Sequence, residues 1–366
     1  MSGIPFESMV AFGAPGRYLQ GPGLLAHLHH AISELGHRPL VLVDAALGEP
    51  LVATLREGLG PLVGATRFEA FSGECTTAAI DAVAAAGQAH RCDIVIGVGG
   101  GKTIDTAKGA RMKLNAALAI LPTIASNDSP TSRLVVIYDD LHVLTETRLM
   151  RTSPDLVLVD TALIARAPRR FLLAGIGDAI SKRFEADQAV ATHGRNFFGG
   201  RGGQVALAIA NHCYQTIRQD AEAALAAADL KSPDAAFERL VEACVLGSGL
   251  SFESGGLSIA HSMLRGFSLV PSLARSLHGE QVAVGLLIQL AAGGDAGVDI
   301  NDLVAFYRRI GLPTTLQDLG LDEPLEHVAD RIVERTVGTS PYIAHFSPTV
   351  TRESLKSALM KVHAQG

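Results

Sequence analysis

The chain has 366 residues, a formal net charge of -6, 48% hydrophobic residues and 19% charged residues. This balance is typical of a globular protein, and the acidic charge provides no basic surface for nucleic acid or an anionic membrane. One hydrophobic core rarely extends over so long a chain, so we expect two packed domains.

The longest apolar stretches, such as 282–292, are shorter than a bilayer span. Only four cysteines occur, and they form no CxxC pair. This usage favours reduced thiols over a disulfide framework or a thiolate zinc site, so any metal must use other ligands. We therefore expect a cytoplasmic protein.

The first half of the chain alternates short β-rich runs with helical stretches. Apolar residues recur at helical spacing over 23–36, where Gly36 is placed to end the helix, and over 76–90. The alternation predicts a Rossmann-like, doubly wound parallel sheet. Its strands are expected at 40–43, 67–71, 93–98, 117–121, 134–138 and 155–159.

The sequence composition changes near Pro168, a helix breaker: β-rich runs precede it and long Ala/Leu-rich segments follow it. Helices are expected at 204–229, 232–250 and 280–292. The sequence thus predicts an α/β domain over 1–167 and an all-helical domain over 168–366, with the ligand site in a cleft between them.

A glycine run, Gly97 to Gly101, lies between a predicted strand and a helix that begins near Lys102. Unpaired amides at such a helix start attract phosphate, and glycine lets the backbone approach the ligand closely. The run matches neither GxGxxG nor the Walker pattern, and its alternative is a turn without a ligand. We interpret Gly99, Gly100 and Gly101 as a phosphate-binding turn.

Asp44 ends the earlier strand at 40–43. A carboxylate at a strand end can accept from a ribose hydroxyl and repel a 2′-phosphate, which favours NAD over NADP. The alternative is an ordinary turn or cap aspartate.

Several segments together resemble the glycerol dehydrogenases of the iron- or zinc-dependent alcohol dehydrogenase superfamily. The resemblance implies a dehydroquinate-synthase-like fold with a metal between its two domains, and homo-oligomers are common in the family. The segments are 71–75 (FSGEC), 96–108 (IGVGGGKTIDTAK), 121–126 (LPTIAS), 174–178 (AGIGD), 252–256 (FESGG) and 277–280 (LHGE). The residues implied to lie along the dinucleotide are Gly99, Gly100, Lys102, Asp105, Thr123, Ser126, Ser132, Leu134 and Tyr138, with Asp44 near its adenosine end.

The resemblance also implies that Asp178, His261 and His278 are metal ligands. Asp178 follows two glycines and is expected to open a helix. One carboxylate and two imidazoles would leave a coordination position open for substrate, as a catalytic zinc requires, although ferrous iron accepts the same donors. Singly, the aspartate has an alternative role as a helix cap and each histidine as a core residue.

By the same resemblance, Asp128 is placed to bind substrate hydroxyls and Phe252 forms a pocket wall. The alternatives are an Asx turn before Pro130 for the aspartate and plain core packing for the phenylalanine.

Basic residues depart from the family pattern near the expected cleft. Lys182 lies four residues after Asp178 and so shares its helix face, and the other departures are Arg183, Arg195 and Arg265. These cations suggest a substrate with a carboxylate or phosphate, whereas the alternative is a solvated surface or ion pairs with neighbouring acids.

The leading hypothesis is an NAD-dependent, metal-assisted dehydrogenase of small vicinal diols, with glycerol first and zinc favoured over iron. A second keeps the chemistry but uses a 2-hydroxy or 2-oxo carboxylate or a polyol phosphate as substrate. The remaining hypotheses are a dehydroquinate-synthase-like lyase and a cofactor-binding protein without catalysis.

Overall fold

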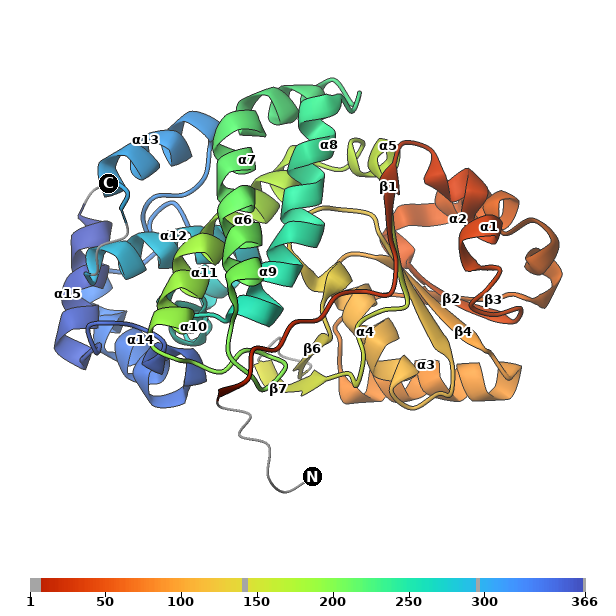
Figure 1. The fold of residues 1–366 in the computed structure, drawn as a ribbon, viewed down its shortest axis with the longest axis horizontal. Helices are drawn as coiled ribbons and strands as arrows, with labels where there is room; N and C mark the ends of the chain where they lie inside the picture. The colour runs from red at the N-terminus through yellow and green to blue at the C-terminus, as the bar shows by residue number, and fades with distance from the viewer. Residues whose placement is uncertain (1–7, 140–143, 294–296, 365–366) are drawn as a thin grey trace.

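The computed structural model describes residues 8–139, 144–293 and 297–364. Figure 1 shows a sheet-containing half, drawn in red to yellow, beside a helical half drawn in green to blue. The sheet has six strands in the order β1-β8-β5-β4-β2-β3, and every pairing is parallel. They are β1 (Tyr18–Gly21), β2 (Pro39–Asp44), β3 (Arg67–Phe71), β4 (Ile94–Gly99), β5 (Ala117–Pro122) and β8 (Leu156–Asp160).

The central strands are runs of aliphatic residues, and every residue of β4 and β8 is buried. Strands covered on both faces are typical of parallel sheets. The predicted doubly wound parallel sheet is confirmed, and β2, β3, β4, β5 and β8 correspond to five of the six predicted runs.

The sixth predicted run forms β6 (Leu134–Tyr138), which lies outside the main sheet. It pairs antiparallel with β7 (Leu144–Leu149), a strand that the sequence analysis missed. The four-residue β1 was also missed. Both missed strands are largely half-buried or exposed, so they lack the apolar runs by which the others were found.

The helices of this half connect successive strands. The predicted helix at 76–90 is α3, which begins after Thr76, whose hydroxyl accepts from the Ala79 amide. The helix predicted over 23–36 is shorter than expected, because only a 3₁₀ turn and a five-residue helix form. The elements are η2 (Leu24–His27), α1 (Leu28–Ile32), η3 (Ala45–Leu47), α2 (Gly48–Leu59), η4 (Gly60–Ala65), α3 (Thr77–His90), α4 (Gly101–Arg111), η5 (Ser129–Thr131) and α5 (Thr161–Ile164).

The helical half begins with α6 (Arg169–Ala191), for which Pro168 is the N-cap residue. The helices predicted at 204–229 and 280–292 correspond to α7 and α12. The elements that follow α6 are α7 (Gln204–Asp229), α8 (Ala235–Glu242), η6 (Ala243–Gly247), α9 (Ser248–Gly255), α10 (Ile259–Phe267), α11 (Pro271–Ala274), α12 (His278–Ala291), α13 (Ile300–Ile310), α14 (Leu325–Thr339), η7 (Pro341–Ala344) and α15 (Arg352–His363).

The helix predicted over 232–250 is interrupted, because η6 is a π-helical turn between α8 and α9. The Thr131 hydroxyl donates to the Val245 carbonyl at 2.9 Å, inside this turn. A side chain that bonds a helix carbonyl from outside is a recognised cause of such irregularity. The turn comes directly before Ser248, which contributes to the site described below.

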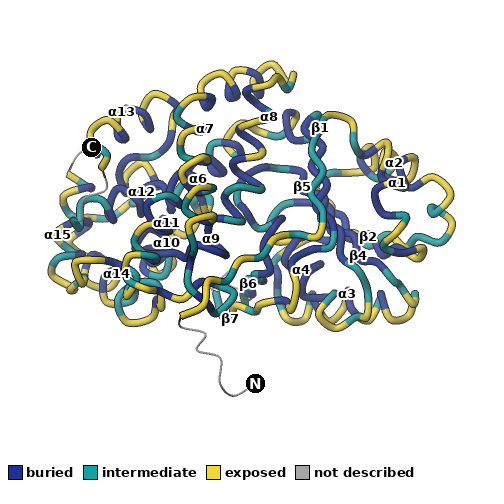
Figure 2. The backbone as a smooth tube through the Cα atoms, in the orientation of Figure 1, coloured by how far each residue is buried: buried dark blue, intermediate teal, exposed yellow. Residues whose placement is uncertain are grey.

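Buried residues are dark blue in Figure 2, and the hydrophobic ones among them form two clusters. The smaller cluster packs α1 and α2 against one side of the sheet, with Leu28 and Leu55 fully buried. The larger one includes α3 and α4 and continues through the helical half to Val362. One hydrophobic core therefore joins the two halves, and the proposed division at 167/168 stays a prediction.

Candidate metal and cofactor site

Three helices bring the proposed metal ligands together. Asp178 lies in α6, His261 in α10 and His278 at the start of α12, with one donor atom of each within 4.8 Å of the others. The Asp178 side chain is fully buried, whereas that of His278 is 42% exposed. The cluster is thus closed on the protein side and open on the side of His278.

Glycines permit this close approach of the helices. A Cβ at Gly177 would lie 2.3 Å from the Gly279 carbonyl oxygen, and one at Gly175 would lie 2.0 Å from that of Ala125. The expectation that Asp178 opens a helix is wrong, because α6 begins at Arg169. The two glycines before Asp178 are there for close packing inside a continuous helix, not for a helix start.

The donor atoms suit a divalent ion. Asp178 Oδ1 lies 3.2 Å from His261 Nε2 and 3.6 Å from His278 Nε2. Donors around a tetrahedral ion with bonds of about 2.1 Å lie roughly 3.4 Å apart. Asp178 Oδ2 is buried and has no hydrogen-bond partner among the described residues. An unpaired buried carboxylate oxygen is costly unless a cation completes it.

Glu185, which the sequence analysis did not assign to the site, holds His261 in place. Its Oε2 lies 2.5 Å from His261 Nδ1, and its Oε1 accepts from the amides of Ser258 and His261. Nδ1 therefore carries the ring proton and Nε2 faces the cluster, as in carboxylate–histidine–metal arrangements. The available signal was its spacing, seven residues after Asp178 on the same face of α6.

Lys182 also points into the cluster, as its spacing predicts. Its Nζ lies 2.6 Å from Asp178 Oδ1, 3.1 Å from Asp128 Oδ2 and 3.1 Å from His261 Nε2, and the side chain is 1% exposed. Its ammonium group is thus already compensated by carboxylates of the chain. An anionic substrate would need a cation that is free to pair with it, and Lys182 is already paired with Asp128 and Asp178.

The other basic departures do not restore that argument. Arg183 turns away from the cluster and places its guanidinium 4.7 Å from the ring centroid of Tyr214. Arg265 is partly buried, near Tyr138 and Tyr342. Arg195 takes part in an isolated bridge with Arg201. The anionic-substrate alternative is therefore not favoured.

The electrostatics of the cluster depend on mutual compensation. Burial alone would raise the pKa of Asp178, but Lys182 and the two histidines hold it well below its usual range. Burial also opposes ionisation of Glu185, yet His261 lowers its pKa. Burial alone would lower the pKa of His261, but Glu185 raises it to about 8.

Asp128 reaches the cluster from the segment between β5 and β6. Its Oδ2 accepts from the Ser248 hydroxyl at 2.7 Å and lies beside Lys182. Oδ1 makes neither of these two contacts. Phe252 is 3% exposed, and its ring centroid lies 5.6 Å from Lys182 Nζ. Both residues border the cluster, while their roles toward a substrate stay predictions.

The glycine turn lies where the strand order of the sheet reverses. Chain order runs from β2 outward to β3 and then returns to β4 on the other side of β2. Ligands of doubly wound sheets bind outside the carboxyl ends of the strands at this point. Asp44 ends β2 and Gly99 ends β4, and a Cβ at Gly99 would lie 3.1 Å from that of Asp44.

Gly100 is the N-cap residue of α4, and no side chain caps it. The start of α4 is therefore a candidate phosphate site, with Gly101 as its first residue. Lys102, the next residue, is half exposed and pairs with Glu74 at 2.8 Å. Asp44 also accepts from the Ala46 amide, so its capping role is real and its role toward ribose stays a prediction.

A buried lysine fixes several of the other cofactor candidates. Lys108 Nζ contacts Asp105 Oδ1, the Ser132 hydroxyl and the Leu134 carbonyl at 3.1, 3.3 and 2.8 Å. Asp105 also accepts from the Val136 amide. These groups are occupied by their own chain, so we expect them to shape the cofactor site rather than to bind the dinucleotide with those atoms.

Of the remaining candidates, Thr123 contacts the end of the glycine turn. The Thr123 amide donates to the Gly99 carbonyl at 3.1 Å, and Ser126 is buried three residues further on. The Tyr138 amide donates to the Cys75 carbonyl, and burial raises the pKa of its phenol.

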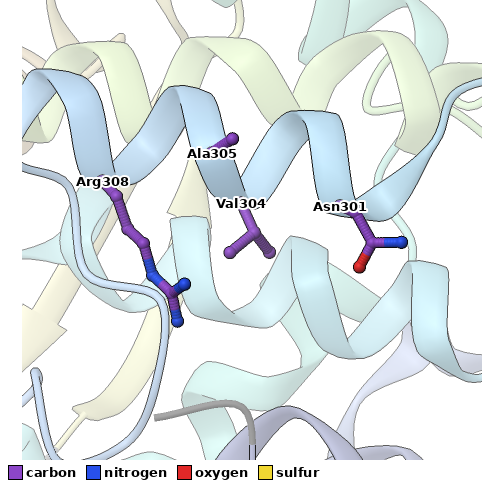
Figure 3. Close-up of a pocket in the computed structure, with 4 residues that line it drawn as sticks. All are labelled: Asn301, Val304, Ala305 and Arg308. Carbon is purple, nitrogen blue, oxygen red and sulfur yellow. The ribbon is translucent and has the colours of Figure 1, made fainter.

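A separate hollow on α13, shown in Figure 3, is lined by Asn301, Val304, Ala305 and Arg308, none of which belongs to the candidate site.

The protein combines a doubly wound sheet, which carries a glycine turn, with helices that carry an Asp–His–His donor set. This combination is typical of metal-dependent dehydrogenases with an α/β half and a helical half. The model of the family described as iron-containing alcohol dehydrogenase matches residues 15–161. The chain is 36% identical to a glycerol dehydrogenase of Thermotoga maritima over 96% of both chains. The chain belongs to the iron-containing alcohol dehydrogenase family and is an alcohol dehydrogenase.

Two further similarities agree with this assignment. The structure of a probable glycerol dehydrogenase from Sinorhizobium meliloti superimposes with a TM-score of 0.90, at 36% identity over 98% of this chain and 99% of the other. A hydroxycarboxylate dehydrogenase A of Escherichia coli is 30% identical over 99% of both chains. Among the helices that the structure describes, none has the length and apolar character to cross a membrane.

Proposed function

We propose that the protein oxidises a small vicinal diol, foremost glycerol to dihydroxyacetone, with NAD as hydride acceptor and one divalent metal ion. The observation that carries the proposal is the convergence of Asp178, His261 and His278 on one point beside Asp128. The relatives named as glycerol dehydrogenases, at 34–36% identity over almost their whole length, support the substrate.

Asp178, His261 and His278 would hold the metal. A divalent ion bound there supplies the Lewis acidity that favours ionisation of an alcohol. Glu185 fixes the tautomer of His261, so that Nε2 presents its lone pair to the cluster. Asp128 Oδ1 accepts a hydrogen bond from a second substrate hydroxyl, which selects a diol over a simple alcohol.

The dinucleotide would lie across the carboxyl ends of β2 and β4, with its pyrophosphate at the start of α4. The segment after β5 carries Thr123 beside the glycine turn and Asp128 beside Lys182, so a dinucleotide that follows this segment would direct its nicotinamide toward the metal cluster. Asp44 supports NAD over NADP. Zinc is proposed over iron because a carboxylate and two imidazoles are common ligands of catalytic zinc.

Two further features belong to the proposal. The protein is expected to form a homo-oligomer, because homo-oligomers are common in the family that the sequence resembles. Light scattering after size-exclusion chromatography tests this expectation. A cytoplasmic location is supported by the four free cysteines.

The test is a panel of substrates on metal-loaded protein, with NAD and NADP in parallel. Glycerol and other vicinal diols should give the highest kcat/KM, with net formation of NADH. The panel includes 2-hydroxy acids and glycerol phosphates, because a hydroxycarboxylate dehydrogenase is among the relatives. Preference for such anions would contradict the proposed substrate, and a product formed without net NADH would point to the lyase.

A further inference from the structure

Lys182 contacts the same donor atoms that the proposed metal requires. Its Nζ lies 2.6 Å from Asp178 Oδ1 and 3.1 Å from His261 Nε2. It extends from the same helix as Asp178, four residues later, and is 1% exposed. The ammonium group thus lies within the cluster, where no solvent shields it.

The metal would need the two atoms that Lys182 contacts. Glu185 accepts the Nδ1 proton of His261, so Nε2 is the ring nitrogen that faces the cluster. Lys182 Nζ lies within hydrogen-bond distance of this nitrogen and of Asp178 Oδ1. A metal ion bound to both donors would displace the ammonium group from them, because two cations at one pair of donors repel each other.

Asp128 already pairs with the ammonium group. Its Oδ2 lies 3.1 Å from Lys182 Nζ, and the ring centroid of Phe252 lies 5.6 Å from the same atom. The lysine stem is flexible, and its ammonium donates in three directions. The group can leave His261 and still be paired with Asp128.

The charges agree with an exchange of this kind. With His261 neutral, as metal binding requires, Asp128, Asp178 and Glu185 supply three negative charges and Lys182 compensates one of them. Two remain, which a divalent ion would neutralise. Lys182 therefore keeps the metal-free cluster paired, but it also weakens the attraction of the cluster for a cation.

We propose that Lys182 is a built-in competitor of the metal: its ammonium group occupies donor atoms of Asp178 and His261 when no metal is bound, and keeps only its pairing with Asp128 when the metal binds. The inference rests on the metal centre of the proposed function. Its consequence is an enzyme that exchanges its metal more readily than the three ligands alone would allow.

The test compares metal retention by wild type, Lys182→Met and Arg183→Met. Each protein is loaded with Zn²⁺ and dialysed against graded concentrations of a chelator, and the retained zinc is measured by mass spectrometry. Starting from the loaded state makes the comparison valid even where metal-free Lys182→Met is unstable. Arg183→Met removes a charge from the adjacent position of the same helix, whose side chain packs on Tyr214.

Lys182→Met should bind zinc at least about tenfold more tightly, the lower end of the effect of residues around metal ligands. Arg183→Met should stay within about twofold of wild type. Zinc should also raise the melting temperature of Lys182→Met more than that of wild type, because Asp178 loses its counter-charge in the metal-free state. Lys182→Gln serves as the second variant if Lys182→Met does not fold.

Equal or weaker retention of zinc by both Lys182 variants overturns the inference and leaves the metal centre standing. If no protein retains zinc, the proposed metal centre itself is wrong and the inference fails with it. The role of Asp128 in holding the displaced ammonium group is tested by a double-mutant cycle. Asp128→Asn should weaken zinc retention more in wild type than in Lys182→Met, and equal losses overturn this role of Asp128.

Discussion

Glu185→Gln is expected to weaken metal binding without unfolding the protein. Glu185 is fully buried and accepts from His261 Nδ1 at 2.5 Å and from two backbone amides through its other oxygen. Glutamine keeps an oxygen for the two amides. Its NH₂ group, however, faces Nδ1, where two donors cannot bond.

The ring of His261 must then adopt the other tautomer, in which Nδ1 accepts and Nε2 carries the proton. Metal binding requires the Nε2 lone pair, so it has to reverse this tautomer and give up the new bond. A hydrogen bond to a charged group contributes about 1.5–3 kcal/mol. We therefore expect the affinity for zinc to fall about 10- to 100-fold.

The assay is competition with a chromophoric chelator at one pH, followed by kcat/KM at saturating zinc. Glu253→Gln is the matched control, because Glu253 is also buried and accepts from a backbone amide, that of Arg133, but contacts no metal donor. It should leave zinc affinity within about twofold. Wild-type affinity in Glu185→Gln, or an equal loss in Glu253→Gln, would refute the orienting role.

Three further predictions concern packing, cofactor choice and thiols. Gly175→Ala should lower the free energy of unfolding by about 1–3 kcal/mol, because its Cβ would meet the Ala125 carbonyl oxygen at 2.0 Å. Gly338→Ala is the control, because a Cβ there would meet no atom within 4 Å. Equal melting temperatures of the two variants would contradict the proposed clash. Asp44→Asn keeps the cap acceptor but removes the charge, so the ratio of kcat/KM for NADP to that for NAD should rise about tenfold; an unchanged ratio would exclude the ribose role. Burial raises the pKa of all four cysteines, and Cys75, Cys213 and Cys244 are buried. At pH 8 these three thiols of the native protein should therefore react slowly with a thiol reagent, and all four should react only after unfolding. Rapid reaction of three or four thiols in the native protein would contradict the packing.

The central strands of the sheet were predictable because they are buried on both faces and so consist largely of aliphatic residues, as in β4. The same criterion could not identify β1 or β7, whose residues lie half in solvent. It also could not separate β6 from the main sheet, since pairing partners are not encoded in a run of apolar residues. Similarly, Ala/Leu-rich helical spacing predicted 232–250 as one helix, and the bond from Thr131 that interrupts it comes from a distant part of the chain.

In the candidate site, too, the features set by local helical spacing were predictable, whereas those that depend on contacts between distant segments were not. The sequence suggested Asp178 as a helix opener because glycines precede it, and only the structure shows that Gly177 faces the backbone of α12. Lys182 was correctly expected to share the face of Asp178, but its charge compensation by Asp128 depends on the fold. Helical spacing also places Glu185 on this face, but the sequence analysis did not assign it to the site, because its partner His261 lies 76 residues away.

One short segment couples the two parts of the candidate site. Thr123 bonds the end of β4 beside the glycine turn, and Ala125 packs its carbonyl directly on Gly175 of α6. Asp128 then reaches Lys182, one helical turn after the proposed metal ligand Asp178. A displacement of α6 against the sheet would therefore move the proposed metal cluster and the glycine turn relative to each other. A misplacement of about 1 Å can cost roughly 100-fold in rate, so we expect the small residues at this contact to contribute to catalysis as well as to packing.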